Sequence, residues 1–192
     1  MSEELTTKWD ARYRAAEGEV TACYALREFA HLLPNEGEAL DLACGRGGNA
    51  LLLAEQGLQT QAWDLSSVAV EHLQSLADAR GLAIRASVRD VEQAPPPANS
   101  FDVIVVSYYL DRGLAPALMN ALKPNGLLFY ETFIREKPPG LGPSNPDYLL
   151  RENELLRLFN RLHLLAYREE GLVGTMGKGQ RSVAMLVAQR RI

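Results

Sequence analysis

The feature that constrains this chain most is the segment ALDLACGRGGNALLLAEQG at residues 39–57, where an apolar run leads into a glycine-rich loop and then into a helical pattern. We predict a strand at 39–43 and a helix over about 49–56. Gly45 and Gly47 permit a tight turn and let a ligand approach the backbone closely, while the first turn of the helix presents unpaired N–H groups. This order of elements is typical of a nucleotide cofactor site in a parallel α/β fold.

Beyond this segment, short apolar runs alternate with helical ones, which predicts a doubly wound, Rossmann-like α/β fold. We expect seven strands in one mostly parallel sheet, with the last strand antiparallel and helices on both faces. The further strands are expected at 60–64, 84–88, 101–106, 127–132, 164–168 and 183–188. The further helices are expected at 68–80, 115–122 and 151–161, with a turn at 123–126.

With 192 residues, the chain has the length of one domain. We expect three parts within it: an N-terminal helical cap at 1–38, a cofactor-binding core at 39–135, and a C-terminal helix and strand pair at 136–192. The best helix of the cap is expected at 20–33. The segment 137–147 carries four prolines and two glycines, so it is expected to be an irregular loop and is a candidate lid.

Acidic residues lie near the carboxyl ends of the predicted strands, where ligands bind in this fold. They are Asp41, Asp64, Asp90 and Glu131. The glycine loop followed by Asp64 also fits an NAD site, in which the acid binds a ribose. A pyrophosphate beside Asp41 meets like-charge repulsion, whereas a sulfonium and an ammonium group are attracted. The charges therefore favour S-adenosylmethionine over NAD, and NAD stays open as an alternative.

Residues 39–132 resemble the class I S-adenosylmethionine-dependent methyltransferases. The segments DLACGRGGN, WDLS and RDV are similar, in order and spacing, to successive cofactor motifs of that family. KWDARY at 8–13, the CGRGGN loop and LKPNGLLFYETF resemble the bacterial tellurite-resistance-type methyltransferases within it. The chain departs from the family at Ala43, where a glycine is usual.

For the methionyl end of the cofactor, the resemblance implies that Asp41 holds the amino group, directly or through water. It also implies that the backbone from Gly45 to Gly47 lines the methionyl part. The other residues expected along the methionyl chain and the methyl group are Ala43, Asn49, Ser107 and Tyr108.

For the nucleoside end, the same resemblance implies that Asp64 accepts both ribose hydroxyls and that Leu65 covers one face of the adenine. Asp90 is expected to accept from the adenine amino group, and the Val91 N–H to reach a ring nitrogen.

Two aromatic residues of the N-terminal cap, Trp9 and Tyr13, match positions at which the related group lays a helix over the cofactor. Aromatic residues four apart on a helix also pack on a core, so both interpretations stay open.

The resemblance implies methyl transfer to a small-molecule acceptor by in-line displacement, in which the protein mainly aligns the reactants in a dry pocket. A base is needed only where the acceptor is protonated. The candidate catalytic residues are Tyr108, Tyr109 and Glu131, since they lie near the ends of predicted strands. Cys23 and Cys44 lack the spacing of metal ligands, so no metal is expected.

The net charge of −4 argues against nucleic acid as a partner. No apolar run suits a membrane span and the N-terminus lacks a secretory signal pattern, so we expect a cytoplasmic monomer or homodimer. Lys178 and Arg181 either attract an anionic acceptor or form a solvated rim. The alternative functions are an NAD-dependent oxidoreductase and a non-catalytic module that binds S-adenosylmethionine.

Overall fold

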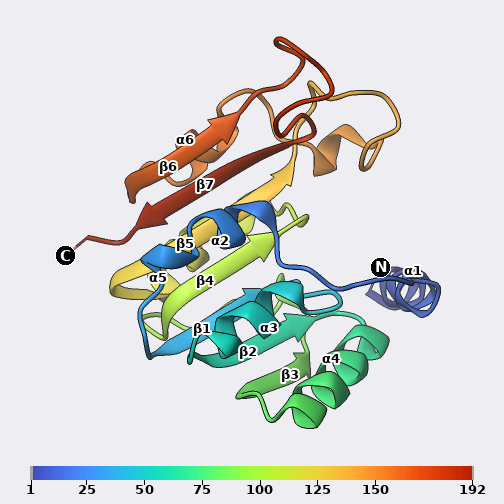
Figure 1. The fold of residues 1–192 in the computed structure, drawn as a ribbon, viewed down its shortest axis with the longest axis vertical. Coiled ribbons are helices and arrows are strands. Elements are labelled where there is room, and N and C mark those ends of the chain that lie inside the picture. Colours follow the sequence, from blue (N-terminus) through green and yellow to red (C-terminus); the bar gives the residue numbers. More distant parts are fainter. Residues whose placement is uncertain (1, 192) are drawn as a thin grey trace.

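The computed structural model describes residues 2–191, within which seven strands form one sheet in the order β3-β2-β1-β4-β5-β7-β6 (Figure 1). Neighbouring strands are parallel from β3 to β5, and β7 runs antiparallel to both β5 and β6. The predicted doubly wound fold with an antiparallel last strand is confirmed. The strands are β1 (Glu38–Leu42), β2 (Gln59–Asp64), β3 (Ile84–Val88), β4 (Phe101–Ser107), β5 (Leu122–Phe133), β6 (His163–Glu169) and β7 (Val183–Gln189).

Helices cover both faces of the sheet, as the continuous burial of β4 from Val103 to Val106 requires. Val105 of β4 packs in the same apolar cluster as Leu26, whereas the next residue, Val106, packs in the same cluster as Leu118. One face carries α2 (Tyr24–Glu28), α3 (Gly48–Glu55) and α4 (Ser67–Arg80). The other face carries α5 (Ala115–Ala121) and α6 (Glu154–Leu158).

The strand order reverses at β1, which lies between β2 and β4. In doubly wound sheets, ligands bind outside the carboxyl ends of the strands at this reversal. The first helix, α1 (Ser2–Arg14), lies beyond the arrowheads of β1 and β2, on the side where a ligand is expected (Figure 1).

The N-terminal cap is helical only in parts. An irregular segment, here named the strap (residues 15–23), joins α1 to the short α2, and a 3-10 helix follows. The helix expected at 20–33 is therefore wrong over its first residues. The reason is tertiary, because the backbone N–H of Cys23 donates to Asn49 Oδ1 (2.9 Å) and that of Ala25 donates to Glu131 Oε2 (2.8 Å).

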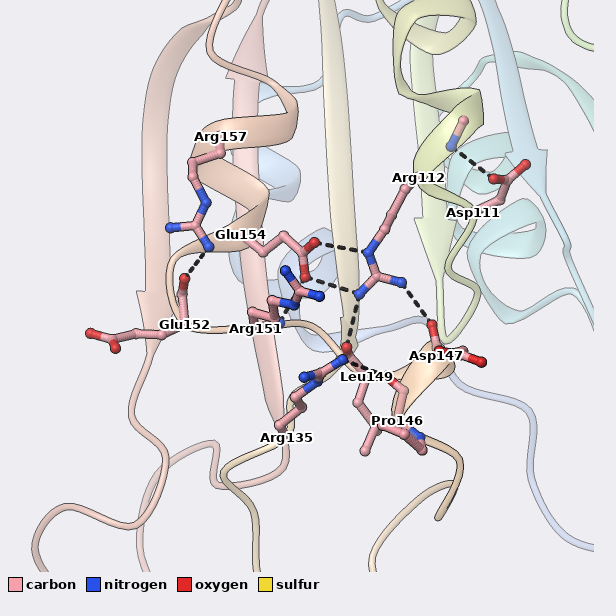
Figure 2. A network of polar contacts seen from close by, with 11 residues as sticks. Asp111, Arg112, Arg135, Pro146, Asp147, Leu149, Arg151, Glu152, Glu154 and Arg157 are labelled. Atoms are coloured by element: carbon pink, nitrogen blue, oxygen red, sulfur yellow. Dashed lines mark hydrogen bonds and ion pairs between the residues drawn. The ribbon is translucent and has the colours of Figure 1, made fainter.

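The helix expected at 151–161 is also shorter than predicted. Asn153 has a left-handed backbone (φ 55°) immediately before α6 begins. The Arg112 guanidinium binds both carboxylate oxygens of Glu154, at 2.8 Å (Nε to Oε1) and 3.0 Å (Nη2 to Oε2) (Figure 2). An ion pair with a distant part of the chain thus determines where this helix starts.

The loop predicted at 137–147 is irregular, and its ends are held together. Ile134 and Leu150 form a parallel bridge across its base. Arg112 also donates to the carbonyl oxygens of Asp147 (2.7 Å) and Leu149 (3.0 Å), so the end of the loop is anchored (Figure 2). The lid stays a prediction, and it would concern only the residues before this anchor.

The turn expected at 123–126 lies within β5 as an irregularity of the strand. The pairing of β5 with β4 shifts register there, and Asn125 has φ 65°. The Asn125 N–H donates to the carbonyl oxygen of Arg190 at 2.7 Å, so the segment stays in the sheet.

Among the helices of residues 2–191, none combines the length and the apolar character that crossing a membrane requires.

Ala43 ends β1 because its backbone is left-handed (φ 55°), a conformation that costs a residue with a Cβ about 1 kcal/mol. We expect Ala43→Gly to raise the free energy of unfolding by up to about 1 kcal/mol in urea titrations, less the entropy that glycine adds to the unfolded chain. The matched control Ala54→Gly, inside α3, should lower it by about 1 kcal/mol. A loss of stability in Ala43→Gly would contradict the left-handed geometry.

Glu154→Gln should lower the free energy of unfolding by about 2 kcal/mol, because charge-assisted hydrogen bonds to Arg112 are lost. Hydrogen bonding to Arg112 lowers the pKa of Glu154. The stabilisation is therefore present above the unfolded pKa and disappears as the pH falls through the folded one. Urea titrations at several pH values measure both effects, with the exposed Glu152→Gln as control. Equal stability of the two variants would contradict this role.

Candidate functional site

The glycine loop between β1 and α3 has a left-handed backbone at every second residue. The φ angles are 55° at Ala43, 51° at Gly45 and 82° at Gly47. The Gly47 N–H donates to the carbonyl oxygen of Cys44 at 2.8 Å, and Gly47 is the N-cap of α3. The loop thus turns sharply and directs the first N–H groups of α3 toward the carboxyl edge of the sheet.

Gly48 is required by packing that the sequence pattern does not reveal. A Cβ on this residue would lie 2.2 Å from the carbonyl oxygen of Thr21, because the strap passes directly against the start of α3. Arg46 holds the strap on the other side, where its Nη1 and Nη2 donate to the carbonyl oxygens of Glu17 (3.0 Å) and Gly18 (2.8 Å). The glycine loop and the strap therefore form one unit.

Asp41 is fully buried, and neighbouring groups occupy both of its oxygens. Oδ2 accepts from the Ala50 N–H (3.0 Å) and Oδ1 accepts from Asn49 Nδ2 (3.2 Å). Burial raises the pKa of Asp41 to about 7. The same Nδ2 donates to Ser107 Oγ at 2.9 Å, so the structure brings Asp41, Asn49 and Ser107 together, and their contact with the methionyl part of a cofactor stays a prediction.

Asp64 ends β2 and is also buried. Its Oδ2 accepts from the Gly45 N–H (2.8 Å) and its Oδ1 from the Ser66 N–H (2.9 Å). Desolvation by burial raises the pKa of this carboxyl group. Asp64 therefore holds the glycine loop against the start of α4.

Helix α1 closes over this part of the loop. Asp10, which the sequence pattern did not single out, accepts a short hydrogen bond from Ser66 Oγ, and Tyr13 Oη lies 2.9 Å from where a Cβ on Gly45 would be. Trp9 and Tyr13 stack on each other with ring centroids 5.8 Å apart. Tyr13 thus lies against the glycine loop, and Trp9 packs on Tyr13; neither belongs to the apolar clusters of the sheet.

Two of the residues expected at the adenine, Asp90 and Val91, lie in the connection between β3 and β4, and the third, Leu65, follows β2. Asp90 accepts from the Glu92 N–H (3.1 Å) and from Gln93 Nε2 (2.9 Å), so it shapes its own turn. Val91 is buried, and Leu65 is half-buried. Tyr109 belongs to this side, because its hydroxyl lies 3.4 Å from Glu92 Oε1.

Tyr108, at the end of β4, and Glu131, near the end of β5, contact each other on the side opposite Asp90 and Tyr109. Tyr108 Oη donates to Glu131 Oε1 at 3.0 Å, and the Tyr108 ring lies 5.2 Å from that of Phe133. The structure thus joins two of the three candidate catalytic residues and separates Tyr109 from them.

The two residues of the predicted basic rim, Arg181 and Lys178, have different surroundings in the structure. Arg181 turns toward its own loop, where it donates to the carbonyl oxygens of Lys178 (2.5 Å) and Thr175 (2.9 Å) and pairs with Glu170. Lys178 is exposed and lines an open cleft together with Arg168. Arg181 therefore organises the β6–β7 connection, and an attraction of anions by Lys178 stays a prediction.

Residues 39–126 match a family model described as a methyltransferase domain. Among curated proteins, hemagglutinin 1 of Eikenella corrodens is 28% identical over 141 residues, or 69% of this chain and 46% of that protein. The chain thus spans about half the length of this relative.

Two solved structures illustrate the likeness of fold. TehB from Haemophilus influenzae superposes with a TM-score of 0.75 at 20% identity, covering 95% of this chain and 67% of that chain. Geranyl diphosphate C-methyltransferase from Streptomyces coelicolor A3(2) superposes with a TM-score of 0.70 at 15% identity, covering 98% of both chains.

The residues that match the family model include β1, the glycine loop and both buried acids, Asp41 and Asp64, and they lie at the strand reversal of a doubly wound sheet. Residues 39–126 are thus similar to the methyltransferase-domain family, and the chain has the fold of the solved methyltransferase structures.

Proposed function

We propose that this protein transfers a methyl group from S-adenosylmethionine to a small-molecule acceptor by in-line displacement. The observation that carries the proposal is the pair of buried carboxylates, Asp41 and Asp64, at the ends of adjacent strands beside a left-handed glycine loop. Burial raises the pKa of both groups, so a cationic ligand at this edge relieves an electrostatic cost. The pyrophosphate of NAD would increase that cost, which disfavours the oxidoreductase alternative.

The residues at this edge fit the cofactor in position and chemistry. When bound, S-adenosylmethionine supplies a methyl group activated by the adjacent sulfonium. Asp64 is proposed to accept from the ribose hydroxyls, with Leu65, Asp90 and Val91 at the adenine. Each oxygen of Asp41, like each oxygen of Asp64, already accepts one protein hydrogen bond and can accept a second, so Asp41 is proposed to hold the amino group directly or through water.

Helix α1 is proposed to exclude water from the cofactor. Trp9 and Tyr13 stack together, the Tyr13 hydroxyl lies beside Gly45, and Asp10 fastens the helix to Ser66. A dry pocket strengthens the electrostatic interactions on which displacement at a sulfonium depends.

A small acceptor is supported by the likeness to geranyl diphosphate C-methyltransferase, whose structure holds that small molecule. The likeness to TehB supports a placement near the tellurite-resistance type. A monomer or homodimer in the cytoplasm stays a prediction.

Isothermal titration with S-adenosylmethionine and its demethylated product tests the cofactor step, and turnover of methyl-labelled cofactor tests catalysis. Asp64→Asn should weaken cofactor binding about 10- to 100-fold, since charge-assisted hydrogen bonds contribute about 1.5–3 kcal/mol. Asp102→Asn is the matched control, because Asp102 pairs with Lys123 at the opposite edge of the sheet. Unchanged affinity in Asp64→Asn would contradict the proposed ribose contact, and binding without turnover would favour the non-catalytic module.

Cofactor affinity should rise with pH up to about 7, because Asp41 is largely protonated below its raised pKa and a cationic ligand favours the carboxylate. For the same reason, Asp41 lowers the free energy of unfolding of the unliganded protein as the pH rises from about 4, near its unfolded pKa, to about 7. Titration calorimetry at pH 6 in two buffers of different ionisation enthalpy should therefore detect proton release on binding. Asp41→Asn should abolish the release, and proton uptake by the native protein would contradict the assignment.

A further inference from the structure

Tyr108 is held in a strained conformation at the end of β4. Its φ angle is 56°, in the left-handed region that a residue with a bulky side chain rarely adopts. Three contacts impose this geometry: the Tyr108 N–H donates to the Glu131 carbonyl oxygen (2.8 Å), the hydroxyl donates to Glu131 Oε1 (3.0 Å), and the ring packs on Phe133. The tertiary structure thus places this side chain at one position beside Ser107.

The partner carboxylate lies beneath Tyr108. Glu131 is 1% exposed, whereas Tyr108 is 53% exposed. Glu131 Oε2 accepts from the Ala25 N–H at 2.8 Å, which leaves Oε1 for the tyrosine. A molecule that enters from solvent therefore meets the hydroxyl of Tyr108 before the carboxylate.

This arrangement determines what the hydroxyl can recognise. A phenol that donates its proton to a carboxylate presents oxygen lone pairs to its other neighbours, so it accepts hydrogen bonds from O–H or N–H groups. The carboxylate also polarises the hydroxyl and strengthens such a bond.

We propose that Tyr108 and Glu131 form a proton relay, and that the methyl acceptor is an uncharged molecule whose nucleophile is an O–H or N–H group. The inference rests on the proposed methyl transfer. It assigns Tyr108 as the catalytic residue that touches the acceptor, and Glu131 as the proton store that acts through it.

The relay balances charge and atoms. A lone pair on the acceptor's oxygen or nitrogen forms the new bond to the methyl carbon, while the carbon–sulfur bond breaks and leaves its electron pair on sulfur. The acceptor's proton passes to Tyr108 Oη as the tyrosine's own proton passes to Glu131 Oε1. The loss of the sulfonium charge is thereby matched by neutralisation of the carboxylate.

The groups around the pair favour this chemistry over attack by an anion. Besides Glu131, Arg27 of α2 and Cys23 of the strap act electrostatically on Tyr108, and Glu131 and Asp41 act on Cys23. Burial, followed by the charge of Glu131, raises the pKa of Tyr108, so the tyrosine passes a proton rather than ionising. An anionic acceptor here would meet the charge of Glu131 and would have no proton to give.

The first experiment needs neither acceptor nor cofactor. In protein labelled with ¹³C at the tyrosine Cζ, the Tyr108 signal, assigned by its loss in Tyr108→Phe, should shift in Glu131→Gln, because the hydroxyl then no longer donates to a carboxylate. Tyr167, whose hydroxyl is bonded to Glu169 on β6, is an internal control whose signal should not move. A Tyr108 signal at the same position in both proteins would overturn the relay.

The second experiment uses methyl-¹³C-labelled cofactor and a small-molecule extract, with NMR identifying the atom that carries the labelled methyl group. Methylated oxygen or nitrogen is expected, and methylated sulfur, carbon or a metalloid would overturn the proposal. Tyr108→Phe and Glu131→Gln should each lower turnover about 100-fold or more, a larger loss than any change in cofactor affinity measured by titration calorimetry. The double variant should be no slower than either single one, because the two residues act as a unit.

Two controls separate the possible failures. Tyr167→Phe removes a hydroxyl that is likewise bonded to a glutamate, and it should leave turnover unchanged. Native turnover should be slower in D₂O, and that slowing should disappear in Tyr108→Phe. Cofactor binding without any labelled product would refute the proposed function and the relay with it. Full turnover in Tyr108→Phe would refute the relay alone.

Discussion

The candidate site depends on the buried side-chain amide of Asn49. Its Nδ2 donates to Asp41 on β1 and to Ser107 on β4, while its Oδ1 accepts from the backbone of Cys23 in the strap. A buried amide is costly without partners, so these three segments must meet at one place for the protein to fold. The position of the glycine loop, the end of β4 and the course of the N-terminal strap are thereby coupled.

Three acidic side chains are buried at this edge of the sheet, and their loss of water has an electrostatic cost. Asp41, Asp64 and Glu131 are nearly or fully buried, and each is bound by backbone N–H groups that partly compensate the loss of water. Asp41 and Asp64 surround the glycine loop, whereas Glu131 lies beneath Tyr108. The fold thus separates Asp41 and Asp64, which are proposed to bind a cationic cofactor, from Glu131, which is proposed to receive a proton.

The strands and the glycine loop could be predicted because they depend on local signals. Each of these features is formed by neighbouring residues: an apolar run of strand length, a glycine at a tight turn, or an acid near the end of a strand. The helices expected at 20–33 and 151–161 failed for the opposite reason. Their first residues are held by Glu131 and Arg112, which lie far away in the sequence and outweigh helix propensity.

By itself, the sequence determined the doubly wound sheet, its antiparallel last strand and the edge at which the acids gather. Only the tertiary structure decided that Gly48 must be small, that Asp10 fastens α1, and that Tyr108 and Tyr109 face different partners. Periodicity reports which side of an element is apolar, since that preference is repeated along a short stretch. A single hydrogen bond such as that between Tyr108 and Glu131 leaves no repeat, because it exists only where folding brings two strand ends together.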